Sequence, residues 1–351
     1  MGAVSRRACA TCLMSLLLVL LSACEKPRES SLDPVLWEDF QQRFVRDGRV
    51  VDTGNDDISH SEGQGYGMLL AVAADDRTGF AELWQWTARV LQREDGLLSW
   101  RYTPCPQADT RCVTDHNNAS DGDLLVAWAL LRAHDAWGKA DYLAAAERIL
   151  AAAEQQLVVE QQGYVLLLPG AVGFRHGDAV TVNLSYWVFP ALEAFQRKRP
   201  DAPWQALTES GIALIDAARF GTAQLPPDWL ELDGHGLRPS PRFPARYGFE
   251  AGRIPLYMTW AGMTPADDWQ AFERLWQRDP VPAWIDLADG STAEYAWSRG
   301  MASIAELPGS EFDGAKPEWA PISSEGGHDP MDYYGHVLLL LTHLAAAEPS
   351  R

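Results

Sequence analysis

Three stretches of the sequence set acidic side chains among glycines or aromatic residues. In SHSEGQGYGM, Glu62 stands among three glycines just before an apolar run. In DHNNASDGDLLVAW, Asp121 and Asp123 stand at the start of another apolar run. In RYGFEAGRIPLYMTW, Glu250 precedes Arg253 by three residues and has aromatic neighbours. Carboxyl groups that converge on one cavity can supply the general acid and the general base of a hydrolytic reaction.

Each of these acids also has a purely structural interpretation. Acids in the first turn of a helix are stabilised by the helix dipole, and Ser61 suits the N-cap position of the first apolar run. Glu250 and Arg253 could form an ordinary ion pair one helical turn apart, worth roughly a few tenths of a kcal/mol at a surface. The pattern recurs, however, with Gly63 and Gly122 each next to an acid. This recurrence favours carboxylates that converge on a polar cavity.

Aromatic residues are abundant and several stand in polar company. The chain has 15 Trp, 10 Tyr and 11 Phe, and the segments around Trp100, Tyr186 and Tyr333 combine rings with charged or amide side chains. A sugar is apolar on its ring faces and hydroxylated around its edge, so aromatic faces backed by acids and amides suit it. Acids in such a cleft indicate hydrolysis of a glycosidic bond.

Composition restricts the class of protein and its partners. The chain has 351 residues, 47% of them hydrophobic, which is enough for one large or two ordinary domains with a buried core. Its formal net charge of −19 predicts a surface that repels nucleic acid and anionic lipid headgroups. We therefore expect no nucleic-acid partner and a neutral or cationic substrate.

The N-terminus has the pattern of an export signal. Arg6 and Arg7 precede an apolar run that is too short to span a membrane. The run ends in LSAC, which resembles the bacterial lipobox and implies that residues 1–23 are removed and Cys24 is lipidated. An ordinary signal peptide cut nearby is the alternative. Residues 24–33 then form a short tether.

Export also bears on the other cysteines and on location. Once the signal is removed and Cys24 is lipidated, Cys105 and Cys112 remain, and an oxidising compartment favours a disulfide between them. Two cysteines and a nearby His116 are too few ligands for a metal site, so no metal is expected. Because Glu25 is not the aspartate that retains many lipoproteins in the inner membrane, we expect a periplasmic protein held at the outer membrane by its lipid alone.

Most of the chain has a helical pattern, in which apolar residues recur every three or four positions. The expected helices cover 34–47, 61–75, 78–92, 120–136, 139–156, 181–197, 203–219, 252–262, 265–277, 295–305 and 332–347. One hairpin is expected at 157–168, and loops rich in Gly, Pro and Asp leave little room for a large sheet. We expect a single domain over 34–347. Successive helix pairs do not resemble each other in sequence, which favours a closed ring over an open solenoid.

Together, SEGQGYGM, ASDGDLLVAWALLRAHDAW and YGFEAGRIPLYMTW resemble three motifs of family 8 glycoside hydrolases. NLSYWVFPAL and DYYGHVLLLL extend the resemblance, from about residue 35 to 345, to the branch of periplasmic endoglucanases that accompany bacterial cellulose synthase. The resemblance implies an all-α (α/α)6 barrel with a cleft across one end. It also implies hydrolysis of internal β-1,4 links of cellulose with inversion of the anomeric configuration and without a cofactor. The expected location is near a cellulose synthase export complex.

The resemblance assigns a role to each acid. Glu62 takes the position of the general acid, and Asp121 that of a residue that binds and helps distort the sugar. Glu250 takes the position of the general base, where the family has an aspartate. The extra methylene moves the carboxylate by about 1 to 1.5 Å, and positional errors near 1 Å can lower a rate by ~100-fold. The side chains expected to contact the sugar are Tyr66, Trp100, Tyr186, Tyr247, Arg253, Tyr333 and Tyr334.

Three other functions remain open at the level of sequence. The same scaffold could act on mixed-linkage glucan, xylan or chitosan, which a panel of polysaccharides would distinguish. A non-catalytic glucan-binding protein is the second alternative, with Glu250 marking lost chemistry. The third is a membrane-tethered helical scaffold for protein partners, which gives no reason for the pattern of acids.

Overall fold

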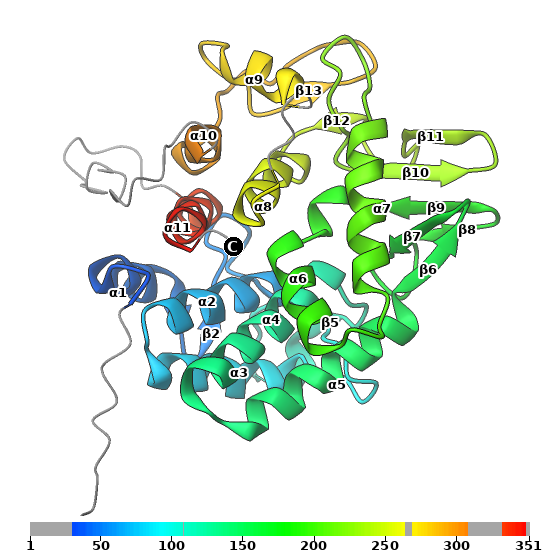
Figure 1. The fold of residues 1–351 in the computed structure, drawn as a ribbon. Helices are drawn as coiled ribbons and strands as arrows, with labels where there is room; N and C mark the ends of the chain where they lie inside the picture. Colours follow the sequence, from blue (N-terminus) through cyan, green and yellow to red (C-terminus); the bar gives the residue numbers. More distant parts are fainter. Residues whose placement is uncertain (1–29, 108, 264–268, 308–331, 349–351) are drawn as a thin grey trace, which may run out of the picture.

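The computed structural model describes residues 30–107, 109–263, 269–307 and 332–348, and within them eleven α-helices (Figure 1). The helices are α1 (Pro34–Phe44), α2 (Ser61–Ala73), α3 (Arg77–Val90), α4 (Ser120–Trp137), α5 (Ala140–Gln156), α6 (Phe189–Lys198), α7 (Trp204–Ala217), α8 (Ile254–Trp260), α9 (Gln270–Trp276), α10 (Arg299–Glu306) and α11 (Tyr333–Ala347). Each overlaps one of the eleven expected helical ranges. The first residues expected for α9, 265–268, lie outside the described part.

The helices form a closed ring. Helix α2 contacts α4, α4 contacts α6, α6 contacts α8, and α8 contacts α11. Helix α11, the last helix of the described residues, also contacts α2 and so completes the circle. Figure 1 views this ring through its opening, and α3, α5 and α7 lie outside it. These outer helices pack against α2, α4 and α6, respectively. The expected closed ring is therefore confirmed, and the open solenoid is wrong.

Burial explains which helices are inner and which are outer. Every residue of α2 is buried except Glu62, and α11 is likewise buried along most of its length. A helix that is apolar all round must be surrounded by other elements. The outer helix α3 instead buries a single stripe that includes Phe80, Leu83 and Trp86 and exposes its polar face.

Glycines allow the first two inner helices to approach each other closely. A Cβ at Gly65 would lie 2.5 Å from the Cβ of Leu125 in α4, and one at Gly122 would lie 2.1 Å from the Oγ of Ser61. Gly63 likewise leaves room for the hydroxyl group of Tyr333. The glycines around Glu62 thus serve close packing, which brings the first turns of α2, α4 and α11 together.

The cap of α2 differs from the expectation. Ser61 is the first helical residue, and the N-cap is His60, whose Nδ1 accepts a hydrogen bond of 3.0 Å from the amide of Gly63. The prediction that Ser61 caps the helix is therefore wrong by one residue. The reason is tertiary, because Ser61 Oγ lies against Gly122 and its amide instead bonds the carbonyl of Trp100.

The expected hairpin at 157–168 is confirmed as β6 (Val158–Gln161) and β7 (Tyr164–Leu167). No large sheet was expected, and the described residues contain a small one that the sequence analysis did not predict: β8 (Arg175–His176), β9 (Ala179–Val182), β10 (Leu230–Asp233) and β11 (Gly236–Pro239) form a four-stranded sheet. Its strand β9 and a 3-10 turn, Leu184–Tyr186, occupy the first part of the helix expected at 181–197. Pro190 near the start of α6 fixes where that helix begins.

The remaining strands have two or three residues each. They are β1 (Val45–Arg46), β2 (Arg49–Val50), β3 (Ser59–His60), β4 (Arg101–Tyr102), β5 (Val113–Asp115), β12 (Arg246–Tyr247) and β13 (Ile285–Asp286). Strand β3 pairs with β4 and leads directly into α2, and β4 pairs with β5. These short ladders fix the loops at one end of the ring.

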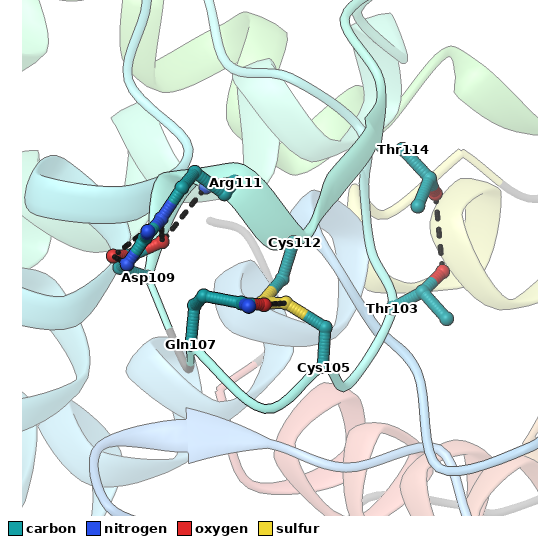
Figure 2. Close-up of a disulfide and its surroundings, with 7 residues drawn as sticks. All are labelled: Thr103, Cys105, Gln107, Asp109, Arg111, Cys112 and Thr114. Atoms are coloured by element: carbon teal, nitrogen blue, oxygen red, sulfur yellow. Dashed lines mark hydrogen bonds and ion pairs between the residues drawn. A yellow bond between two sulfur atoms is a disulfide. The ribbon is translucent and has the colours of Figure 1, made fainter.

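Cys105 and Cys112 form a disulfide with their Cα atoms 5.5 Å apart (Figure 2). It closes the loop between β4 and β5, and the ion pair between Asp109 and Arg111 lies within the same loop. The disulfide thereby limits the conformations of the loop behind Trp100. Within the described residues, no helix combines the length and apolar character needed to cross a membrane.

Candidate active site

A cavity of about 460 Å³ lies where α2, α4 and α11 begin. Eight of the residues singled out in the sequence line it: Glu62, Trp100, Asp121, Tyr186, Glu250, Arg253, Tyr333 and Tyr334. These residues span most of the chain, so the closed ring brings them together. A second cavity among α7, α8 and α9, of about 70 Å³, contains none of them and is too small for a sugar.

Arg253 connects the acids of the cavity. Its Nη1 pairs with Oε1 of Glu62 and its Nη2 pairs with Oε2 of Glu250, while Oδ2 of Asp121 lies 4.0 Å from the same Nη2. Only 3% of the Arg253 side chain is exposed. A charge so far removed from water is stable only with opposite charges beside it. One buried guanidinium group therefore holds carboxylates from two separate elements at the cavity.

Glu62 is positioned in the first turn of α2 and is mostly buried. The hydroxyl group of Tyr66, one helical turn later, donates to Oε1 of Glu62 over 3.1 Å and lies 2.8 Å from the hydroxyl group of Tyr257. Nδ1 of His60 lies 3.8 Å from Oε2 of Glu62. Tyr66 thus lies behind the acid rather than on the cavity wall.

Glu250 lies at the start of the 3-10 turn before α8, with a third of its side chain exposed to the cavity (33%). Asn183 donates to its Oε2 over 3.0 Å, and the hydroxyl group of Ser185 lies 3.5 Å from the same atom. Burial raises the pKa of Glu250, and Asp228 and Asp121 raise it further, whereas Asn183 and Ser185 lower it. The ion pair with Arg253 also favours the charged form.

Asp228 supports the turn that carries Glu250. Its Oδ1 accepts hydrogen bonds of 2.9 Å from the amides of both Gly248 and Ala251. Burial raises the pKa of Asp228 to about 6, while these amides act in the opposite direction. The sequence analysis missed this residue, since nothing in the local sequence LPPDW indicates that its partners lie twenty residues later.

The two aspartates at the start of α4 have different surroundings. Asp121 faces the cavity, and burial raises its pKa to about 7 although it accepts a hydrogen bond from the amide of Gly122. Asp123 points away and accepts hydrogen bonds from the amide of Leu98 (2.8 Å) and from Asn118 (2.7 Å). Asp123 therefore fixes neighbouring loops, whereas Asp121 is available to a ligand.

Aromatic side chains form much of the remaining wall. Trp100, Tyr186, Phe249, Tyr333 and Tyr334 line the cavity. Phe249 is 42% exposed, and the hydroxyl group of Tyr334 donates to the Phe249 carbonyl over 2.5 Å. A wall of rings with carboxylates between them matches the surface of a sugar chain.

Tyr247 does not belong to this wall, although it was expected to contact the sugar. Its side chain is fully buried and packs against Phe272, with ring centres 5.9 Å apart. The turn after β12 directs Phe249 toward the cavity instead. The sequence signal, an aromatic near the acid, does not indicate which ring points inward.

His60 is a further member of the cavity that the sequence analysis did not select. Its Nδ1 accepts the α2 cap bond, and its Nε2 lies 3.5 Å from Oδ2 of Asp52, which also lines the cavity.

The described residues contain no group of three His, Cys, Asp or Glu side chains arranged to hold a metal ion.

Comparison with known proteins gives concordant matches. A family model described as glycosyl hydrolases family 8 matches residues 1–348. A probable endoglucanase of Novacetimonas hansenii is 40% identical over 319 residues, which cover 89% of this chain and 90% of that protein. The endo-β-1,4-glucanase of Acetobacter xylinum has a solved structure that is 37% identical, with a TM-score of 0.82, covering 92% of this chain and 100% of the other.

An endoglucanase from Klebsiella pneumoniae, described as a family 8 glycosyl hydrolase, is similar to the same extent. It is 38% identical with a TM-score of 0.80, covering 89% of this chain and 98% of the other. The fold shared with these structures confirms the expected all-α (α/α)6 barrel.

Proposed function

Because the chain belongs to glycosyl hydrolase family 8, we propose that it is an endo-1,4-β-glucanase that cleaves internal bonds of cellulose. The observation that carries the proposal is the pair of carboxylates, Glu62 and Glu250, on opposite terminal nitrogens of one buried arginine in an aromatic cavity. The endoglucanases named above, which match this chain over about nine tenths of its length, support the same substrate.

The proposed reaction is a single displacement with inversion. Glu62, protonated, donates its proton to the glycosidic oxygen as the bond to the anomeric carbon breaks. Glu250, ionised, removes a proton from a water molecule that attacks the opposite face of that carbon. The two carboxyl groups end the turnover in exchanged protonation states, and solvent restores them. Asp121 binds the sugar on the non-reducing side of the broken bond and favours its distorted form.

The glutamate at the position of the base is compatible with this scheme because its carboxylate is held from several sides. Asn183, Ser185 and Arg253 all contact Oε2 of Glu250. Oε1 is thereby left for a water molecule. These three contacts restrict the position of the Glu250 carboxylate, which a longer side chain without contacts would leave variable.

The test is the release of reducing ends from carboxymethylcellulose and phosphoric-acid-swollen cellulose, beside the Glu62→Gln and Glu250→Gln variants. Loss of roughly 100-fold or more in both variants is expected, since each removes a proton-transfer group. Mixed-linkage glucan, xylan and chitosan serve as competing substrates. Retained binding of cello-oligosaccharides without release of reducing ends from any of them would favour a binding protein instead.

We also infer that the chain is an exported lipoprotein of the periplasm, anchored through Cys24 at the outer membrane and acting near a cellulose-exporting complex. The basic and apolar start and the LSAC ending support the export and the lipid. The lipid is tested by incorporation of labelled palmitate and by fractionation of the Cys24→Ala variant. Recovery of the unaltered chain, unlabelled, in the free periplasmic fraction would contradict the anchor.

A further inference from the structure

The first described residues are fastened to the end of α2 that lies farthest from the cavity. Ser31 and Leu32 donate their amides to the carbonyl of Ala73 over 3.0 and 3.3 Å, and Oγ of Ser30 donates to the same oxygen over 2.8 Å. Leu32 is 1% exposed, so this segment is part of the core. Ala73 is the last residue of α2, whereas Glu62 is in its first turn.

Two other inner helices have the same direction. α4 has Asp121 in its first turn, at the cavity, and Arg132, three turns later, pairs with Glu348 over 2.6 Å. α11 begins with Tyr333 at the cavity and ends at Ala347, and the next residue, Glu348, also accepts a hydrogen bond from Ser31. The three helices therefore start at the cavity and run to one common region on the other side of the ring, where the N-terminal segment is bound.

Helix length sets the distance between these two ends. The 13 residues of α2 correspond to about 20 Å along its axis. Only five residues separate Cys24 from Ser30 in the sequence, and they can span at most about 20 Å when fully extended. In a chain attached through Cys24, the end of the ring opposite the cavity therefore lies close to the lipid anchor.

We propose that the N-terminal attachment orients the enzyme, with the cavity facing away from the membrane and the far ends of α2, α4 and α11 facing the lipid. The inference rests on the proposed lipid anchor. Its consequence is a substrate preference set by position: the cleft receives glucan chains that are free in the periplasmic space, and not chains that lie along the membrane surface.

Two exposed threonines provide a matched test. Thr53 lies between Asp52 and Gly54, which line the cavity, and Thr78 lies at the start of α3, just beyond the far end of α2. With Cys24 lipidated and Cys105 and Cys112 joined, Thr53→Cys or Thr78→Cys adds the single free thiol for a fluorescent donor. The lipidated chain is then incorporated into phosphatidylethanolamine and phosphatidylglycerol vesicles that carry an acceptor on the headgroup.

Energy transfer is expected to be roughly twofold or more higher from position 78 than from position 53, because about 20 Å separates the two ends of α2. Equal transfer, or higher transfer from position 53, would overturn the proposed orientation. If the native chain does not float with the vesicles, the lipid anchor has failed. The orientation is then decided with the same two variants carrying a hexahistidine tag in place of residues 1–24, on vesicles with nickel-chelating lipid.

Discussion

At the scale of single residues, the site depends on how Arg253 and its neighbours divide their contacts between two carboxylates. Arg253 contacts Glu62 and Glu250 with different nitrogens, and Tyr66 and Asn183 add one hydrogen bond to each acid. Each acid is thus fixed by its own donor, in addition to the shared charge. Because both carboxylates are already positioned, no reorganisation of these groups is needed when the bond breaks.

Shortening Glu250 tests how the base is held. In Glu250→Asp the carboxylate withdraws by about 1 to 1.5 Å, which breaks its contact with Asn183, and a displacement of this size can lower kcat by ~100-fold. We expect Glu250→Asp to keep measurable activity and Glu250→Gln to lose far more, because only the aspartate can still accept a proton. Steady-state kinetics on carboxymethylcellulose measures both. Equal loss in the two variants would contradict the assignment of a base to this position.

The charge of Asp228 is expected to set the acidic limb of the pH profile. Asp228 raises the pKa of Glu250, so removing its charge lowers that pKa. A general base is active when ionised, so in Asp228→Asn the rise of kcat/KM should move to lower pH. Asparagine can still accept both amide bonds through its oxygen, whereas Asp228→Ala cannot and serves as the control for lost positioning. The other charges facing Glu250, on Arg253, Asp121 and Glu62, stay unchanged. An unshifted limb in Asp228→Asn would show that the charge of Asp228 does not act on the base.

At the scale of elements, the site is made by helices that start at one place. The first turns of α2 and α4 meet because Gly122 lies against Ser61, and α11 joins them through Tyr333 at Gly63. Strand β3, paired with β4, leads into α2 and fixes its first residue. The acids are therefore only as well placed as the contacts between these helix starts.

Gly122→Ala tests this packing. Alanine improves helix propensity by up to ~1 kcal/mol, but its Cβ would lie 2.1 Å from Oγ of Ser61, and such overpacking costs about 1 to 3 kcal/mol. We expect a net loss of stability and a lower kcat, because Glu62 and Asp121 move apart. Gly234→Ala is the matched control, since its Cβ would meet no atom closer than 3.5 Å. Denaturant unfolding measures the stability of both variants, and steady-state kinetics measures their kcat. A Gly122→Ala variant as stable and active as the control would refute the packing role.

The sequence predicted these helices well and the sheet poorly, for a physical reason. Helix signals are local, so the apolar periodicity and the acids at helix starts were sufficient for α2, α4 and α11. The sheet pairs Val180 with Leu232, 52 residues apart, and no local pattern reports such a partner. The same reason explains Asp228, whose bonds to Gly248 and Ala251 exist only in the folded chain.

At the scale of the whole molecule, the cavity exists only when the ring is closed. Its walls come from residues near both ends of the described chain, from Asp52 to Tyr334, and α11 must pack on α2 to bring them together. The opposite end of the ring binds the N-terminal segment. The cavity proposed for catalysis and the bound N-terminal segment are thus separated by the length of the inner helices.

The most direct test of the central claim is the anomeric configuration of the first products. Fresh hydrolysis of cellopentaose by the unaltered enzyme, followed by proton NMR before mutarotation, reports which anomer forms. Glu62 as acid and Glu250 as base of a single displacement predict the α-anomer, the inverse of the bond that is cleaved. Initial release of the β-anomer would contradict the account, because it requires a covalent intermediate on one of the carboxylates and not a water molecule activated by Glu250.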